Sequence, residues 1–211
     1  MKTYLANTEY AVKKIFEAIK HEEDEFINLI TKREAALKEP KFLKNIGWER
    51  GLHKDFDETR VMILFHRAVE ARKRLPKRLK EIDKKIEDIT DNIKLHSESS
   101  KVLCGSLLQF AKQGISIIHK KLSACPSGRE IGQETLKNII WQGRNHALHY
   151  EESPNHKQQV RRCFKNLEDF GLRFCLDNQP NENLSKEIIH LLGWSGYSTF
   201  KEDMLLLSLN N

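Results

Sequence analysis

The sequence predicts an all-α protein, and three observations support this fold class. Charged residues make up 31% of the 211-residue chain and hydrophobic residues 39%, which allows an apolar core enclosed by charged helix faces. The chain contains only 10 Gly and 5 Pro, which favours long helices over a strand-rich fold. Apolar residues recur every three or four positions, and no segment shows strong strand-like alternation. We therefore expect an elongated helical bundle of about five main helices with a long kinked second helix, plus a short C-terminal appendage.

The first expected helix covers residues 8–38. Asn7 or Thr8 can cap its N-terminus. Its apolar stripe, with spacings of three, four or seven, consists of Val12, Phe16, Ile19, Phe26 and Ile30. Pro40 is expected to end the helix, and residues 40–56 are expected to form a loop.

The second expected helix starts near Asp57 and carries a very regular apolar seam. Its positions step by four and three and are apolar except for Arg72: Val61, Phe65, Ala68, Arg72, Leu75, Leu79, Ile82, Ile86, Ile89 and Ile93. Pro76 lies inside this seam. Because proline lacks a backbone donor and clashes with the preceding turn, we expect a kink or break near residues 72–76.

A turn is expected at residues 97–100, after which a third helix, 99–122, folds back on the second as an antiparallel hairpin. A fourth helix starts near residues 132–134 and runs into the sequence Arg-Asn-His-Ala-Leu-His at residues 144–149. Pro154 is expected to begin a new segment, since the residue before a proline avoids helical geometry.

The fifth helix is expected over residues 155–177. After it we expect a short helix over 184–192 and a turn at 193–196. The chain is expected to end in an apolar tail, 204–209, docked on the core. We expect a single domain, 1–211, with a core of about 57–178 on which the N-terminal helix and the tail, 180–211, pack.

Composition also bears on location. The chain has no run of 18 apolar residues and no apolar stretch of signal-peptide length near Met1. Its four cysteines form no C-x-x-C pair. We therefore expect a cytoplasmic protein with reduced thiols and no membrane partner.

The positive charge is concentrated in one segment, residues 67–85, which we call the basic strip. This segment holds nine basic and three acidic residues, an excess of six that equals the formal net charge of the whole chain, +6. Such a strip can attract a polyanion, although it can equally be a solvated helix face. The residues predicted to hold RNA are Arg72, Lys73, Arg74, Lys77 and Arg78.

Residues 144–150 bring an arginine, an asparagine and two histidines directly after an apolar run, and three interpretations compete. His146 and His149, three apart, could share a metal with His119 or His156, but no acidic residue stands at the spacing of a zinc protease. The residues could be purely structural, with Arg144 paired to Glu151 or Glu152.

The third interpretation is metal-independent RNA cleavage. Histidine can move protons at the 2′-hydroxyl and the leaving 5′-oxygen, because its ordinary pKa of about 6.5 leaves both forms available near neutrality. Arginine supplies a forked, permanently charged donor for the phosphate on which charge accumulates.

Helix geometry limits this third interpretation. Arg144 and His149 lie about 140° apart around an ideal helix, whereas Asn145 and His149 share a face. Either the helix unwinds after Gly143 or a second chain completes the site. In both cases Asn145 is expected to bond and orient His149 while Arg144 reaches the phosphate.

The R-x4-H pattern Arg144-Asn145-His146-Ala147-Leu148-His149, late in an all-helical chain, resembles the HEPN superfamily. The resemblance covers about residues 57–178. It implies a bundle of four or five helices, a homodimer that joins two motifs in one cleft, and a metal-independent endoribonuclease that leaves 2′,3′-cyclic phosphate ends. One toxin branch carries a tyrosine two residues after the histidine; here Tyr150 follows directly.

We therefore expect a ribonuclease that needs no cofactor and no metal. It would act as a toxin or effector of a bacterial defence or plasmid-maintenance system, and an antitoxin or regulatory protein is a possible partner. His149 is the expected acid and base, Arg144 the phosphate ligand and Asn145 the orienting residue. His146 is either a second proton carrier or a packed neighbour, and Tyr150 is a further candidate.

Two other functions are compatible with the sequence. One is a catalytically inactive HEPN-like scaffold that binds RNA, nucleotide or a protein partner. The other is an interaction protein rich in coiled coil.

Overall fold

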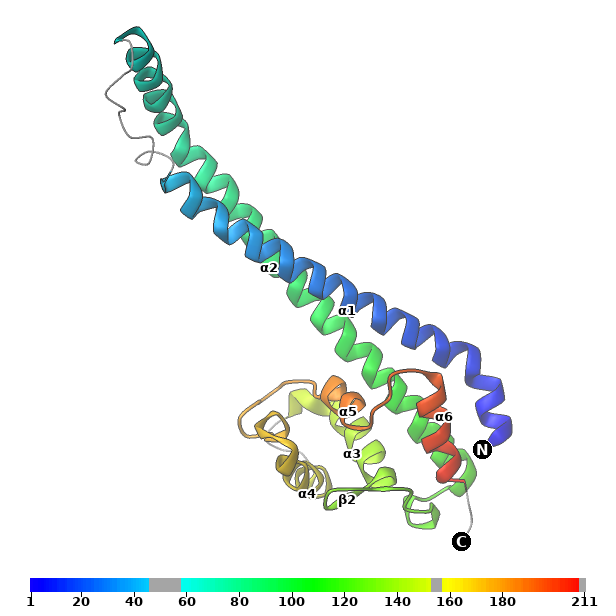
Figure 1. Cartoon of the computed structure of the whole chain (residues 1–211). Coiled ribbons are helices and arrows are strands. Elements are labelled where there is room, and N and C mark those ends of the chain that lie inside the picture. The colour runs from blue at the N-terminus through cyan, green and yellow to red at the C-terminus, as the bar shows by residue number, and fades with distance from the viewer. Residues whose placement is uncertain (46–57, 153–156, 209–211) are drawn as a thin grey trace. The chain divides into compact units, whose positions relative to one another are not determined.

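A computed structural model of the chain describes residues 1–45, 58–152 and 157–208. Helices dominate these residues, so the all-α prediction is confirmed (Figure 1). The chain divides into two compact units, one formed by Met1–Glu23 with Ser97–Asn211 and the other by Asp24–His96. Helices α1 (Lys2–Asn45) and α2 (Glu58–His119) contribute to both units. The prediction of a single domain with a core of about 57–178 stays a prediction.

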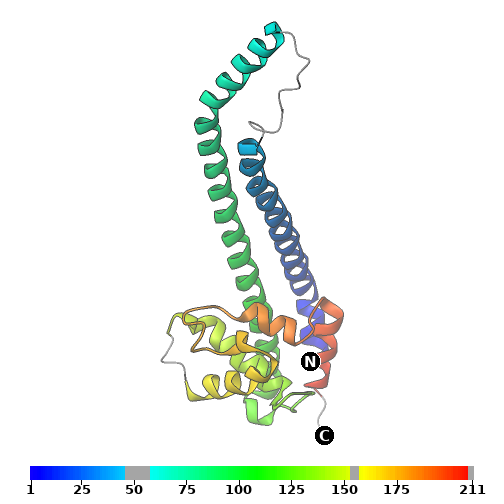
Figure 2. The same ribbon diagram turned by 60° about the vertical axis from the view of Figure 1, so that its left-hand side comes forward.

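The unit Asp24–His96 is an antiparallel pair formed by α1 and α2 (Figure 2). Arg33 Nε donates to Thr90 Oγ1 at 3.1 Å, and Arg78 Nη2 donates to Glu39 Oε1 at 3.0 Å. From Arg33 to Glu39 along α1, the bonded partner in α2 moves back from Thr90 to Arg78, so the two helices run antiparallel. Among the seam residues whose burial is described, Ile82 and Ile89 are buried and Leu75, Leu79, Ile86 and Ile93 are half-buried. The regular seam therefore faces inward here.

The turn expected at residues 97–100 does not form, and this prediction is wrong. Helix α2 continues through the four residues to His119, so the hairpin partner of its first half is α1 and not residues 99–122. The cause is that the apolar stripe stays in phase across the serines, with buried Ser100, Cys104 and Leu107 continuing the seam from Ile93. Capping residues end a helix where the stripe also ends, and here it does not.

Both prolines expected to interrupt helices lie inside them. Helix α1 starts at Lys2 and passes Pro40 before it ends at Asn45, so the bounds 8–38 were too short. Helix α2 continues through Pro76, so no break occurs there, and the kink stays a prediction. A proline inside a helix costs about 3 kcal/mol, which packing along a long seam can offset.

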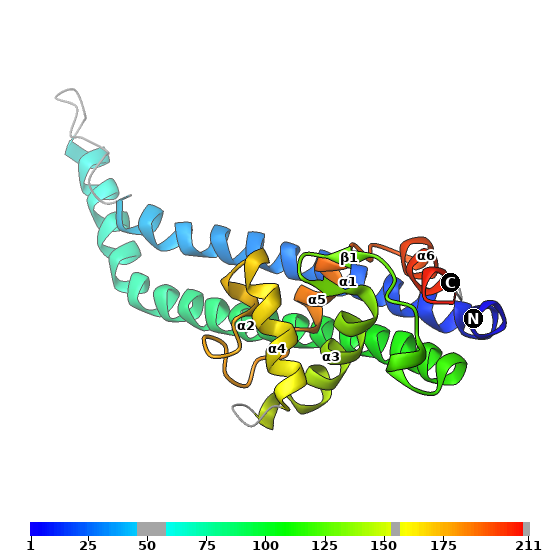
Figure 3. The same cartoon turned by 90° about the horizontal axis from the view of Figure 1, so that it is seen from below.

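The unit Met1–Glu23 with Ser97–Asn211 holds the main hydrophobic core. Helices α3 (Leu136–His149), α4 (Gln158–Leu167), α5 (Ser185–Leu191) and α6 (Tyr197–Leu206) gather around the C-terminal part of α2, which is green in Figures 1 and 3. The N-terminus of α1 joins them, since the Tyr4 hydroxyl donates to the Phe110 carbonyl at 2.8 Å. Fully buried members include Leu107, Ile139, Phe164 and Phe200.

A small hairpin leads into α3. Strands β1 (Glu130–Ile131) and β2 (Glu134–Thr135) pair antiparallel, with Ile131 opposite Glu134. Gly132 turns the chain with a φ of 60°, a value that favours glycine. Helix α3 therefore begins at Leu136, a few residues later than expected.

The segment expected to be a fifth helix, 155–177, is shorter and broken. Residues 153–156, including Pro154, lie outside the described part, and α4 ends at Leu167. Two 3₁₀ turns, Glu168–Phe170 and Leu172–Phe174, follow on either side of Gly171, whose φ of 126° no α-helix allows. The apolar periodicity of the sequence continues through Gly171, but the helical backbone does not.

The C-terminal predictions fare better. Helix α5 covers the expected short helix, and Gly193, with a φ of 66°, begins the expected turn. The tail is docked as expected: Met204 and Leu207 are fully buried. Asp203 anchors it by accepting from Arg129 Nε at 2.8 Å.

Two observations relate to the expected location. The four cysteines are free thiols, and three of them are buried. Burial raises the pKa of Cys104 to about 12 and that of Cys125 to about 11. No helix in the described part of the chain is long and apolar enough to cross a bilayer.

Candidate functional site

Residues 144–149 complete α3 without interruption. The helix runs from Leu136 to His149, and Tyr150 keeps helical angles, φ −63° and ψ −27°, before a 3₁₀ turn, Tyr150–Glu152. Of the two alternatives for bringing Arg144 and His149 together, unwinding after Gly143 is therefore wrong. Gly143 instead permits close packing, since an added Cβ would lie 3.3 Å from Ile188.

Arg144 is half-buried and is held by neutral amides. Its Nε donates to Gln109 Oε1 of α2 at 2.6 Å, and its Nη1 donates to Asn145 Oδ1 at 3.4 Å. Within the described residues no carboxylate forms an ion pair with it, so the pairing with Glu151 or Glu152 considered under the structural interpretation is not found. Partial burial lowers the pKa of the guanidinium, but an arginine remains charged at neutral pH. The positive charge of Arg144 is thus fixed in place and not neutralised.

His149 lies exposed at the end of α3, with 52% of its side chain accessible. Its Nδ1 lies 2.9 Å from Glu152 Oε1. A carboxylate at this nitrogen holds the proton on Nδ1 in the neutral ring, which leaves the Nε2 lone pair free to accept a proton. This is the arrangement that a general base needs.

His146 occupies a very different environment. It is 2% exposed, its Nε2 lies 3.0 Å from the Glu182 carbonyl, and its ring centroid lies 4.7 Å from that of Phe164. Of the two roles left open for His146, this burial favours the packed neighbour over the second proton carrier. Tyr150 is half-buried at the C-terminus of α3.

Asn145 makes different contacts from those expected. Its Nδ2 donates to Gln142 Oε1 at 3.3 Å, and its Oδ1 accepts from Arg144. Because His149 bonds to Glu152 instead, the expected bond between Asn145 and His149 does not form among the described residues. Asn145 therefore orients the arginine and not the histidine.

The metal interpretation finds no support in the geometry of the described residues. Among them, no group of three or more His, Cys, Asp or Glu side chains is arranged to hold a metal ion. His119, one of the candidates, instead directs its Nε2 to the Leu207 carbonyl at 2.7 Å. His156 lies outside the described residues.

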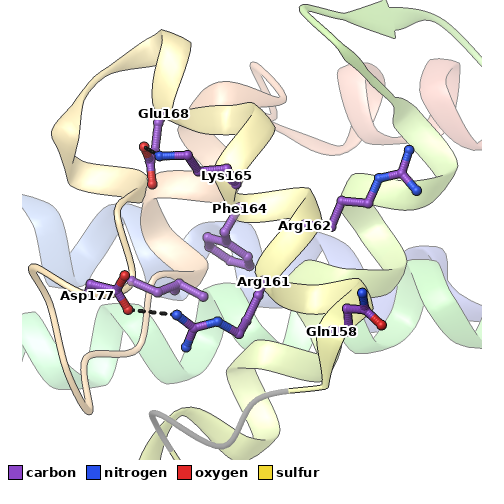
Figure 4. A pocket seen from close by; sticks show the side chains of 8 residues that line it. Gln158, Arg161, Arg162, Phe164, Lys165, Glu168 and Asp177 are labelled. Atoms are coloured by element: carbon purple, nitrogen blue, oxygen red, sulfur yellow. Dashed lines mark hydrogen bonds and ion pairs between the residues drawn. The ribbon is translucent and has the colours of Figure 1, made fainter.

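A hollow of about 340 Å³ lies beside α4 (Figure 4). Its walls carry two ion pairs, Arg161 Nη2 with Asp177 Oδ1 at 2.9 Å and Lys165 Nζ with Glu168 Oε2 at 2.7 Å. Figure 4 shows each cation turned toward its carboxylate, with the Phe164 ring between the two ion pairs. The lining also includes Arg162, for which no ion pair is found among the described residues, so the hollow holds three cations against two carboxylates. Because two of these cations are paired and Arg162 is exposed to water, the hollow is a weaker anion site than Arg144.

The basic strip belongs to the other compact unit, Asp24–His96. Lys73 and Arg78 each form an ion pair with a carboxylate, at 2.8 and 3.0 Å. Arg74 and Lys77 are exposed, and the Arg72 side chain lies outside the described part. The prediction that these five residues hold RNA stays a prediction.

Two residues of the site were not predicted, Gln109 and Glu152 in these roles. Glu152 lies three residues after His149, a spacing that brings side chains together wherever the helical path continues. The sequence therefore contained that signal, but Glu152 was considered only as a partner of Arg144. Gln109 comes from a different helix, and no local pattern relates it to Arg144.

No family model, no curated protein and no solved structure matches the chain. The resemblance to the HEPN superfamily therefore rests on the motif Arg144–His149 and on the helical architecture.

Proposed function

We propose that this protein is a metal-independent endoribonuclease that acts as a homodimer. In this proposal Arg144 of one copy and His149 of the other act on the same phosphate. The protein works in the cytoplasm as a toxin or effector of a bacterial defence or plasmid-maintenance system, and an antitoxin or regulatory protein controls it.

The observation that carries the proposal is the state of Arg144. A cation is normally left in water or paired with a carboxylate, because partial desolvation is costly. Arg144 is half-buried and has two neutral amide acceptors in place of a counter-ion. An incoming phosphate would meet a charge that is already oriented and partly dehydrated, which strengthens the attraction.

The donors that remain on Arg144 suit a phosphate. A guanidinium has five N–H groups, and two of them are used by Gln109 and Asn145 among the described residues. The remaining three include one on Nη1 and two on Nη2. These two nitrogens form the fork that binds two phosphate oxygens at once.

His149 completes the reaction. Its Nε2 takes the proton of the ribose 2′-hydroxyl while the 2′-oxygen attacks phosphorus, and the Glu152 carboxylate stabilises the imidazolium that forms. The Arg144 fork donates to the phosphate oxygens on which negative charge increases. The imidazolium then returns its proton to the leaving 5′-oxygen. The products are a 2′,3′-cyclic phosphate and a free 5′-hydroxyl.

The geometry of α3 is the reason that the proposal includes a second copy. Because the helix is continuous to His149, Arg144 and His149 stay about 140° apart and leave the helix on different faces. Within one chain, the phosphate ligand Arg144 and the base His149 therefore point in different directions. A two-fold dimer that juxtaposes the two α3 ends would place the base of one copy beside the fork of the other.

The test is RNA cleavage by the purified protein with EDTA present, together with its mass in solution by sedimentation. Wild type should form a dimer, cleave RNA and leave cyclic phosphate ends. His149→Ala should remain dimeric and bind RNA but lose cleavage. Cleavage that persists in this variant, or that requires an added metal, would contradict the mechanism, as would an active monomer.

The same experiment identifies the catalytically inactive scaffold, which needs Arg144 but no base. In that case wild type and His149→Ala would bind RNA or nucleotide equally, neither would cleave, and Arg144→Ala would weaken binding. The orientation of Arg144 by amides supports anion binding under either function.

A further inference from the structure

A row of amide side chains leads along α3 from a buried carboxylate to Arg144. Asn138 Nδ2 donates to Glu134 Oε2 at 2.5 Å, and Gln142 Nε2 donates to Asn138 Oδ1 at 3.3 Å. Asn145 Nδ2 donates to Gln142 Oε1 at 3.3 Å, and Asn145 Oδ1 accepts from Arg144 Nη1 at 3.4 Å. The row is continuous because the three amides lie within about 60° of one another around an ideal helix.

The two ends of this row determine the orientation of every amide in it. A carboxylate only accepts hydrogen bonds, so Asn138 must turn its NH₂ group to Glu134. Each following amide must then turn its NH₂ to the oxygen before it, and Asn145 presents its oxygen to Arg144. A guanidinium only donates, so this last contact fits. Any amide turned over would place two donors or two acceptors together.

The Glu134 end of the row is anchored. Glu134 is 7% exposed, and its other oxygen, Oε1, accepts from Asn166 Nδ2 of α4 at 2.8 Å. Gln142 in the middle is 3% exposed, so water competes little for its amide. The hydrogen bonds of 3.3 and 3.4 Å are long, so each one is weak. The orientation of the amides therefore depends more on the groups at the two ends of the row than on the strength of any single bond.

We infer that Glu134 is a positioning residue for Arg144 and acts through this polarised row of amides. This inference rests on the proposed function for its effect on catalysis, and it adds a residue of β2 to the site. Glu134 keeps the oxygen of Asn145 toward Nη1, while Gln109 holds Nε from α2. Held on two sides, the guanidinium keeps its remaining fork in one orientation for the phosphate.

Glu134→Gln tests the inference by changing one acceptor into a donor. The new amide faces two donors, Asn138 and Asn166, with one oxygen. If Asn138 turns over to compensate, the reversal passes along the row and sets an NH₂ group against Arg144. We expect the kcat for RNA to fall by about 10-fold to 100-fold.

A second change should restore the row. In Glu134→Gln with Asn166→Asp, the new carboxylate accepts from the Gln amide, whose oxygen again accepts from Asn138. The pair conserves total charge, and we expect kcat to return to within about threefold of wild type. Glu130→Gln on the neighbouring strand is the matched control, since Glu130 is exposed and should have no effect.

The direct readout is the Nε–H resonance of Arg144 and the rotation of its guanidinium, measured by NMR without RNA. Glu134→Gln should shift the resonance and speed rotation, and the double variant should reverse both. Gln142→Met, which cuts the row and leaves Glu134 in place, should act like Glu134→Gln and serves if that variant folds poorly.

The outcomes separate this inference from the proposed function. If the resonance responds as described but wild type cleaves no RNA, the row stands and the ribonuclease fails. If wild type cleaves RNA while neither Glu134→Gln nor Gln142→Met alters kcat or the resonance, the inference is wrong. A double variant as impaired as Glu134→Gln would also overturn it, because a purely structural defect is not rescued by restored polarity.

Discussion

The basic strip of α2 and the motif of α3 both present cations, but they hold them in different ways. The strip has many cations, of which Lys73 and Arg78 are already paired with carboxylates and Arg74 and Lys77 are exposed. The α3 motif has one arginine, half-buried, partly desolvated and held by two amides. The strip therefore has more cations, whereas the single cation of the α3 motif is the one held in a fixed orientation.

This difference separates attraction from recognition. Exposed lysines and arginines raise the local concentration of a polyanion, and salt screens them strongly. An oriented and partly dehydrated arginine contacts one phosphate at a defined position. The strip should therefore affect how tightly RNA binds, and Arg144 whether the bound RNA reacts.

The largest effect should come from Arg144 itself. Arg144→Ala should lower kcat by about 100-fold to 1000-fold, the cost of losing one preorganised donor for a developing charge. Arg144→Lys should recover little, because an ammonium keeps the charge but not the fork. Single-turnover cleavage at saturating protein measures both.

Arg74→Ala, which removes a cation of the strip, is the matched control and should leave kcat unchanged. Equal losses in Arg74→Ala and Arg144→Ala would remove the distinction between the two regions.

The two histidines of α3 should differ in stability. His146→Ala deletes a ring that is 2% exposed and bonded to the Glu182 carbonyl, and should cost about 2–4 kcal/mol of unfolding free energy. His149→Ala removes an exposed side chain and should cost less than about 0.5 kcal/mol. Urea denaturation followed by circular dichroism gives both values. A stable His146→Ala protein with unchanged cleavage would refute the structural role of His146.

The smallest effect should come from the strip. Reversing Lys73, Arg74 and Lys77 to glutamate should flatten the dependence of RNA affinity on salt, by a slope of about one for each phosphate that the strip no longer neutralises. Affinity should fall several-fold at low salt, and kcat at saturation should not change. An identical slope in the triple variant would mean that these residues are a solvated helix face.

Much of the fold could be predicted from the sequence, because apolar periodicity records which helix faces are buried. The seam through Ile82 and Ile89 and the docked tail with Met204 are confirmed. The errors came from local signals that packing overrides: Pro40 and the serines at 97–100 lie inside helices that they were expected to end. The opposite error occurred at Gly171. The apolar periodicity predicted a helix through this residue, but its positive φ interrupts the helix.

The candidate site was predictable in its residue types and less so in its partners. The divergence of Arg144 and His149 follows from helix geometry. The continuity of α3 removes the alternative of an unwound helix, and the shared cleft stays a prediction. The partners of these residues required tertiary structure. Gln109 lies 35 positions from Arg144, and Asn166 lies 32 positions from Glu134, so no local pattern could relate either pair.

The central claim is that one site uses Arg144 of one copy and His149 of the other. Chains carrying Arg144→Ala and His149→Ala, each with a different affinity tag, can be co-expressed and the mixed dimer purified through both tags. In that dimer one of the two sites keeps both residues, so we predict about half of the wild-type cleavage rate, although each parent dimer is inactive. A mixed dimer as inactive as its parents, alongside an active wild type, would contradict the claim.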